Sequence, residues 1–170
     1  MIVNMRFSKD EHKKWFNGQP RKPMSAAVLF LDEQGKVLLV KSNYRQDWGL
    51  PGGVVEEHES PLDGAIREVK EELGLAIDKA SLQLCAVDYR SAKDDLIDKL
   101  YFYFLGGILD ASSISRVNLQ ADELDEMRFV NLEEARSLLS TWTHQQVAHA
   151  LSSNNQLHYF EDSVPTGDNL

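Results

Sequence analysis

One stretch of this 170-residue chain, from residue 60 to residue 74, encodes both ends of a helix. Ser60 is a good N-cap, and Pro61 suits the first helical position because its missing N–H would have no intrahelical partner there. Gly74 follows Leu73 and is typical of a left-handed C-cap. The pattern predicts a helix from about Pro61 to Leu73, and the rest of the fold must accommodate its faces.

The two faces of this predicted helix differ in character. Apolar residues recur at helical spacing and should pack against a sheet: Leu62, Ala65, Ile66, Val69 and Leu73. Glu68, Glu71 and Glu72 stand at i, i+3 and i+4, so their carboxylates project together from another face. Like charges this close destabilise a helix unless something neutralises them. A hard divalent cation such as Mg²⁺ would do so, and it readily shares its coordination shell with substrate phosphates.

An isolated Glu-x-x-Glu-Glu is more often a solvated helix face than a metal site. Here the flanking residues complete a longer pattern: Gly, five residues, Glu, seven residues, Arg-Glu, an aliphatic, any residue, Glu-Glu, any residue, Gly and an aliphatic. Its nine positions are filled by Gly53, Glu59, Arg67, Glu68, Val69, Glu71, Glu72, Gly74 and Leu75. The segment therefore resembles the signature of the Nudix hydrolases, which cut a diphosphate linked to a nucleoside or another group. The resemblance covers roughly residues 24–139.

The resemblance implies a Mg²⁺-dependent diphosphatase, with Mn²⁺ as the alternative metal. The implied metal ligands are Glu68 and Glu72 as principal ligands, Glu71 for additional ions, and the carbonyl of Gly52. Arg67 is expected to brace the signature carboxylates, including Glu59, because a planar guanidinium can bind several carboxylates at once. The remaining specified positions are expected to be structural: Gly53, Glu59 and Gly74.

The general base has two candidate sources. In the family it is sometimes a signature glutamate, here Glu68 by position, and sometimes an acid from a distant loop. Glu123 and Glu126 lie just before a predicted short strand, where such an acid is often found. A solvated loop is the alternative interpretation of these two residues. In either case, water would attack phosphorus and displace a phosphate or a nucleoside phosphate.

Substrate contacts are predicted mainly from position. Lys41, Tyr44 and Arg45 precede the signature turn and could meet phosphates or a base. Three tyrosines alternate on predicted strands, so some of them must face the core: Tyr89, Tyr101 and Tyr103. Of these three, Tyr89 is the predicted substrate-binding residue. Trp48 is interpreted as a packing residue.

The order of predicted elements indicates an α/β fold. Apolar runs bounded by turn residues predict strands at Met24–Leu31, 36–41, 82–89, 100–109 and 127–130. Further helices are predicted at about 8–16, 132–139 and 143–152. Together with the resemblance, this order predicts a Nudix-type α/β/α sandwich with a mixed central sheet. We expect an N-terminal extension over residues 1–23, one domain over residues 24–160 and a flexible tail over residues 161–170.

The composition of the chain limits the kinds of molecule that it is expected to bind. The formal charge of −9 argues against a protein that grips a nucleic acid polymer by its phosphates, but a metal-bridged small phosphorylated substrate is compatible with it. No apolar run approaches the length of a membrane span, so we expect a cytoplasmic protein without a membrane partner. The lone Cys85 is interpreted as a small core residue. A homodimer is compatible with the apolar strands.

Three rival functions fit the sequence less well than a diphosphatase does. A nucleotide-binding sensor would keep the fold without turnover, but such modules often lose signature carboxylates, and none is lost here. An isomerase of prenyl diphosphates depends on a reactive Cys, whereas Cys85 falls in a predicted buried strand. Removal of RNA caps needs a surface for a long polyanion, and the acidic balance argues against one. The residues that could form a local basic patch are Lys13, Lys14, Arg21 and Lys22.

Overall fold

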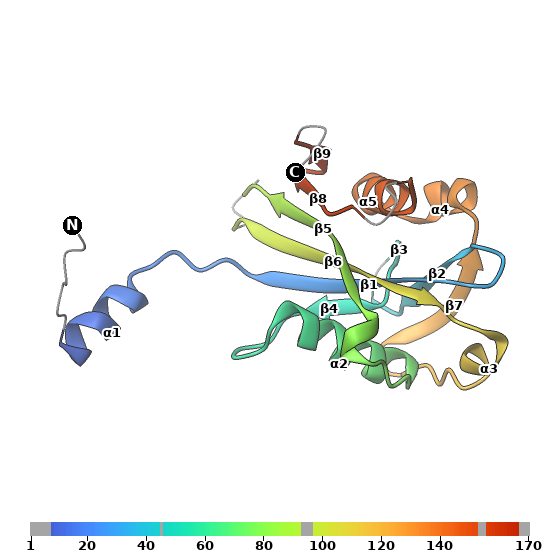
Figure 1. The fold of residues 1–170 in the computed structure, drawn as a ribbon, viewed down its shortest axis with the longest axis horizontal. Helices are drawn as coiled ribbons and strands as arrows, with labels where there is room; N and C mark the ends of the chain where they lie inside the picture. Colours follow the sequence, from blue (N-terminus) through green and yellow to red (C-terminus); the bar gives the residue numbers. More distant parts are fainter. Residues whose placement is uncertain (1–7, 45, 93–96, 153–155, 167–170) are drawn as a thin grey trace.

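The computed structural model describes residues 8–44, 46–92, 97–152 and 156–166. The strands, in chain order, are β1 (Met24–Leu31), β2 (Val37–Ser42), β3 (Trp48–Gly49), β4 (Gly52–Val54), β5 (Gln83–Arg90), β6 (Lys99–Ile108), β7 (Leu124–Val130), β8 (His158–Glu161) and β9 (Val164–Pro165). The helices are α1 (Lys9–Asn17), α2 (Pro61–Leu73), the short 3₁₀ turn η1 (Lys79–Ser81), α3 (Ala111–Ile114), α4 (Leu132–Leu138) and α5 (Thr141–Ser152). Helix α2 lies on one face of the sheet, and α4 and α5 lie on the other (Figure 1).

The sheet is mixed, as the sequence predicted. Its main path runs β3-β2-β1-β6-β5-β8-β9, with β4 paired to β1 and β7 paired to β2. The β1–β6 and β5–β8 pairs are parallel, and the other pairs are antiparallel. Strand β4 occupies the edge of β1 near residues 25–27, whereas β2 meets β1 only near Leu31. The two neighbours of β1 on this side therefore attach at opposite ends of that strand.

Helix α2 forms where its local signals place it. The Ser60 side chain accepts a hydrogen bond from the N–H of Asp63, and Gly74 adopts the left-handed conformation with φ of 69°. The apolar face packs into the core between helix and sheet, where Ala65, Val69 and Leu73 are fully buried. Burial of each larger side chain contributes about 1.5–3 kcal/mol relative to exposure. This packing fixes the opposite, carboxylate-bearing side of the helix relative to the sheet.

A second core fills the space between the sheet and helices α4 and α5. It contains Cys85, Tyr103, Val147 and Phe160, all buried. The thiol of Cys85 donates to the carbonyl of Tyr103, and burial raises the pKa of Cys85 to about 12. The interpretation of Cys85 as a core residue is therefore confirmed.

Several short elements were not predicted. Strands β3, β4, β8 and β9 and helix α3 are each two to four residues long, and their local sequences carry little periodicity. The sequence predicted a flexible tail from residue 161, whereas β8 and β9 extend the sheet through Pro165. Helix α1 stands apart from the sheet and buries none of its residues (Figure 1). In the described ranges, no helix has the length and apolar character needed to cross a membrane.

Candidate active site

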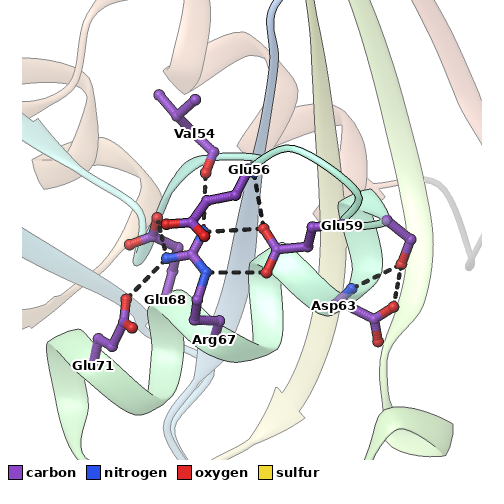
Figure 2. A network of polar contacts seen from close by, with 8 residues as sticks. Val54, Glu56, Glu59, Asp63, Arg67, Glu68 and Glu71 are labelled. Atoms are coloured by element: carbon purple, nitrogen blue, oxygen red, sulfur yellow. Dashed lines mark hydrogen bonds and ion pairs between the residues drawn. The ribbon is translucent and has the colours of Figure 1, made fainter.

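Arg67 is the centre of the polar network on α2 (Figure 2). Its Nε donates to Glu59 at 3.0 Å. Its Nη1 donates to Glu68 at 3.0 Å and to Glu71 at 2.9 Å. Its Nη2 donates to Glu59 at 3.1 Å and to the carbonyl of Val54 at 3.0 Å. These contacts use all five N–H groups of a guanidinium. Arg67 is thereby fully engaged by the protein and has no donor left for a substrate.

The network fixes the loop between β4 and α2. Glu59 lies in that loop, accepts two bonds from Arg67 and also accepts the backbone N–H of Glu56 at 3.0 Å. The hydrogen bonds from Arg67 are the main reason that the pKa of Glu59 lies below its ordinary value. Glu59 therefore remains ionised and ties the loop to the helix.

Glu68 lies in a drier environment than its neighbours. Burial raises the pKa of Glu68 above its ordinary value, although the bond from Arg67 opposes this effect. The negative charges of Glu71 and Glu123 raise the pKa further. Glu71 is the outermost of the three signature carboxylates, with half of its side chain exposed. A second cation near Glu68 would stabilise its charged form.

Glu72 joins the helix to strand β4. Its side chain accepts the backbone N–H of Gly52 at 2.8 Å, and the residue is only 7% exposed. The adjacent Gly53 also lies close to α2, since a Cβ built at this position would lie 2.4 Å from Oε1 of Glu68. A side chain at residue 53 would therefore displace the Glu68 carboxylate. The turn before α2 and the acids on α2 form one compact unit.

The side chains at this site offer the oxygen ligands that a hard divalent cation prefers. Glu68, Glu71 and Glu72 supply carboxylate oxygens on one side of α2, and Gly52 lies against Glu72. Within the described ranges, however, no three His, Cys, Asp or Glu side chains are already grouped as a metal site. Arg67 supplies the positive charge next to Glu68 and Glu71 here. A bound cation would have to share these carboxylates with Arg67.

The structure distinguishes the two loop acids. Glu123 lies close enough to Glu68 to influence its pKa, and its carbonyl accepts the N–H of Asn43 at 2.9 Å. Glu126 instead forms an ion pair with Arg128 at 2.7 Å. Of the two predicted base candidates, Glu123 is therefore the one whose charge contributes to raising the pKa of Glu68.

The predicted substrate contacts fall in different places. The Lys41 ammonium donates to the carbonyl of Gln46, and Tyr44 is largely exposed. Arg45 lies outside the described residues. Tyr89 donates to Asp98 at 3.1 Å and lies under the Lys22 ammonium, 5.3 Å from the ring centre.

Sequence reasoning missed two contributions to this region. The carbonyl of Val54 accepts from Arg67, and no side-chain pattern signals a backbone acceptor. Arg128 lies over the Trp48 ring at 4.8 Å, so Trp48 both packs in the second core and carries a cation. This pair joins β7 to β3, and it could have been anticipated only from strand pairing.

Comparisons with known proteins agree with this geometry. The NUDIX domain family model matches residues 21–151. Protein 111R of Invertebrate iridescent virus 3 is 33% identical over 132 residues, which cover 75% of this chain and 70% of the viral protein. An mRNA-decapping enzyme subunit of Saccharomyces cerevisiae is 38% identical over 52 residues, or 31% of this chain, and the chain spans only 5% of that relative's length.

A solved structure shows the same arrangement of elements. The MutT protein from Methanosarcina mazei is 26% identical, with a TM-score of 0.63, and the match covers 81% of this chain and 100% of that one. The full signature, the sandwich that carries it and the family match over most of the chain lead to one assignment. The chain belongs to the Nudix hydrolase family.

Proposed function

We propose that this chain is a Mg²⁺-dependent hydrolase that cleaves the diphosphate linkage of a small nucleoside diphosphate derivative by attack of water at phosphorus. One observation carries the proposal. The three signature carboxylates of α2 are held by Arg67 and by the N–H of Gly52, directly beside the glycine turn of β4. Such preorganised acids suit chemistry that depends on positioning and on charge stabilisation.

The roles of individual residues follow from their surroundings. Glu68, Glu71 and Glu72, with the carbonyl of Gly52, would hold Mg²⁺. When bound, the ion would neutralise phosphate charge and make a bound water more acidic. Glu123 is the preferred proton acceptor, because its carboxylate acts on Glu68 while Glu126 is engaged by Arg128. Arg67 keeps the acids in place and does not touch the substrate.

The substrate class rests on charge and on size. A net charge of −9 opposes binding of a long polyanion, so a small nucleotide is favoured over an RNA polymer. We do not assign to this chain the decapping activity in the yeast relative's name, because the match covers so little of that protein. Lys41 on β2 is the cation we expect nearest the substrate phosphates.

The proposal is tested by measuring release of phosphate or nucleoside monophosphate from a panel of nucleoside diphosphate compounds. Each compound is assayed with Mg²⁺, with Mn²⁺ and with excess chelator. We expect turnover of at least one compound that disappears when the metal is removed. Tight nucleotide binding without turnover of any compound would contradict the proposal and would favour the sensor function.

A further inference from the structure

Arg90, at the end of β5, is held in an unusually fixed position on the sheet face opposite α2. Its guanidinium carbon lies 4.7 Å from the centre of the Tyr101 ring and 5.3 Å from that of Trp142. Its Nε donates to the carboxylate of Asp88 at 3.0 Å. The side chain is 24% exposed. The Arg90 side chain also interacts with the hydroxyl of buried Tyr103. Two aromatic rings, a hydroxyl and a carboxylate thus fix a cation that has five N–H groups in all.

Asp88 is fully buried and saturated with donors. One of its oxygens accepts the backbone N–H of Ser163 at 3.0 Å. The other accepts the Ser163 hydroxyl at 2.8 Å, Nε2 of Gln146 at 2.6 Å and Nε of Arg90. Asp88 therefore neutralises Arg90 and fixes it in place, and it is already bound by four donors.

Strand register connects this cluster with the signature turn. Val54 of β4 pairs with Ser25 of β1, Ser25 pairs with Tyr101 of β6, and Tyr101 pairs with Asp88 of β5. Three strand spacings correspond to about 14 Å, comparable with the length of an extended nucleoside diphosphate. Within the described residues β4 pairs only with β1, so its other edge is not covered by a further strand.

A second aromatic group borders the same surface. Trp48 bridges to Leu139 just after α4, and Trp142 follows three residues later at the start of α5. Trp48 and Tyr101 both pack against the second core, on the face opposite α2. Trp142 is 40% exposed. The surface next to Arg90 is thus bordered by aromatic rings, each of which already carries an arginine guanidinium on one face.

We propose that Arg90 is a specificity residue that binds the base of the nucleotide substrate, and that it favours a 6-oxopurine over a 6-aminopurine. This proposal deepens the proposed hydrolase function and rests on it for the identity of the substrate. A guanidinium donates hydrogen bonds and accepts none. The O6 and N7 edge of guanine or hypoxanthine offers two acceptors, whereas adenine presents a donor at N6. Because Asp88 neutralises Arg90, a neutral base edge suits the site better than a phosphate does.

Equilibrium binding tests the proposal without requiring turnover. We would titrate the full chain with IMP, GMP and AMP and follow tryptophan fluorescence or heat. We expect IMP and GMP to bind about 10-fold more tightly than AMP, in the lower part of the range for a bidentate arginine contact. The 7-deaza analogue of GMP, which lacks the N7 acceptor, should bind more weakly than GMP. Equal affinities for IMP and AMP would overturn the proposal.

A matched pair of variants locates the effect. Arg90→Lys keeps the charge beside Asp88 but loses the planar fork, so it should bind IMP and AMP with similar affinity. Arg116→Lys alters an exposed arginine that donates to Ser113, far along the chain from Arg90, and should keep the preference. If Arg90→Lys weakens both nucleotides equally, Arg90 is not the specificity residue. If that variant does not fold, the IMP, AMP and 7-deaza comparison on the unaltered chain still decides.

Turnover separates this proposal from the proposed function. With active protein, the guanosine compound should have a lower KM than the matching adenosine compound at a similar kcat. Selective IMP binding without hydrolysis of any nucleotide would contradict the hydrolase function but support the role of Arg90. Hydrolysis without selectivity for the base would support the hydrolase function but contradict the role of Arg90.

Discussion

At the scale of single residues, Gly53 lies directly against the Glu68 carboxylate in the candidate site. An added Cβ at residue 53 would stand 2.4 Å from Oε1 of Glu68, so Gly53→Ala must push the carboxylate aside. Because misplacing a reacting group by about 1 Å can cost 10²-fold in rate, we expect kcat to fall by ~10²-fold. The measurement is steady-state turnover with saturating Mg²⁺.

Gly49 provides the control for this substitution. It lies in the same turn region, and a Cβ there would meet nothing within 4 Å. Gly49→Ala should therefore retain most of the activity, and both variants should unfold near the temperature of the unaltered chain. Full activity in Gly53→Ala would contradict the contact between the turn and Glu68.

Arg67 gives a second prediction at this scale, with a defined pH dependence. Lysine cannot supply five donors, so Arg67→Lys should lower the free energy of unfolding by about 2 kcal/mol near pH 7. The pKa of Glu59 is lowered in the folded chain, so this contribution is present above the unfolded pKa of about 4.3 and is lost as pH falls through the lower folded value.

Urea unfolding at a series of pH values measures this effect. The difference between Arg67→Lys and the unaltered chain should shrink below about pH 4. Arg116→Lys should stay within about 0.5 kcal/mol of the unaltered chain throughout. A difference that does not change with pH would show that Glu59 is not the partner that matters.

At the scale of elements, α2 depends on its C-cap. Gly74 has φ of 69°, and a Cβ there would lie 3.3 Å from that of Asn118. Gly74→Ala should therefore lower the free energy of unfolding by about 1–2 kcal/mol. Gly74→Asn adds the same Cβ but tolerates the left-handed conformation better, so it should cost less. Equal losses in both variants, measured by thermal or urea unfolding, would assign the cost to the Asn118 contact and not to φ.

The elements that could be predicted from the sequence are those with local signals. Helix α2 has its cap, its proline and its terminal glycine, and its predicted bounds are those observed. Strand β1 was predicted with its observed bounds, because a long apolar run needs burial on both faces. Strand β4 is different, since Gly-Gly-Val has no strand character of its own. It is a strand only because β1 has an open edge beside it.

The same distinction applies to the site. The acids on α2 were predictable because one helix carries them all at fixed spacing. The cluster around Arg90 was not, because it joins β5, β6 and α5 through pairings that no local pattern encodes. The preference for Glu123 over Glu126 likewise needed the position of the loop relative to α2.

At the scale of the whole molecule, the C-terminal hairpin completes the sheet. Ser163 supplies two of the donors to buried Asp88, and Phe160 is fully buried in the second core. A chain ending at residue 157 would leave Asp88 with fewer partners and open a cavity. It should lose more than about 3 kcal/mol of stability, or fail to fold.

A chain ending at residue 166 is the matched truncation, because it keeps β8, β9 and every contact just named. It should unfold at nearly the same urea concentration as the full chain. Equal stability of the two truncated chains would contradict a structural role for the hairpin.

The most direct test of the central claim is the turnover of Glu72→Gln beside the unaltered chain, on the best substrate of the panel and across a Mg²⁺ titration. Glutamine keeps the volume and an oxygen that can accept the N–H of Gly52, so the fold should persist. Only a charge is removed from the proposed metal ligands. We predict that kcat falls at least ~10²-fold, a loss of ~2.7 kcal/mol in transition-state stabilisation. An unchanged rate and an unchanged Mg²⁺ requirement in a folded Glu72→Gln protein would contradict the metal assignment.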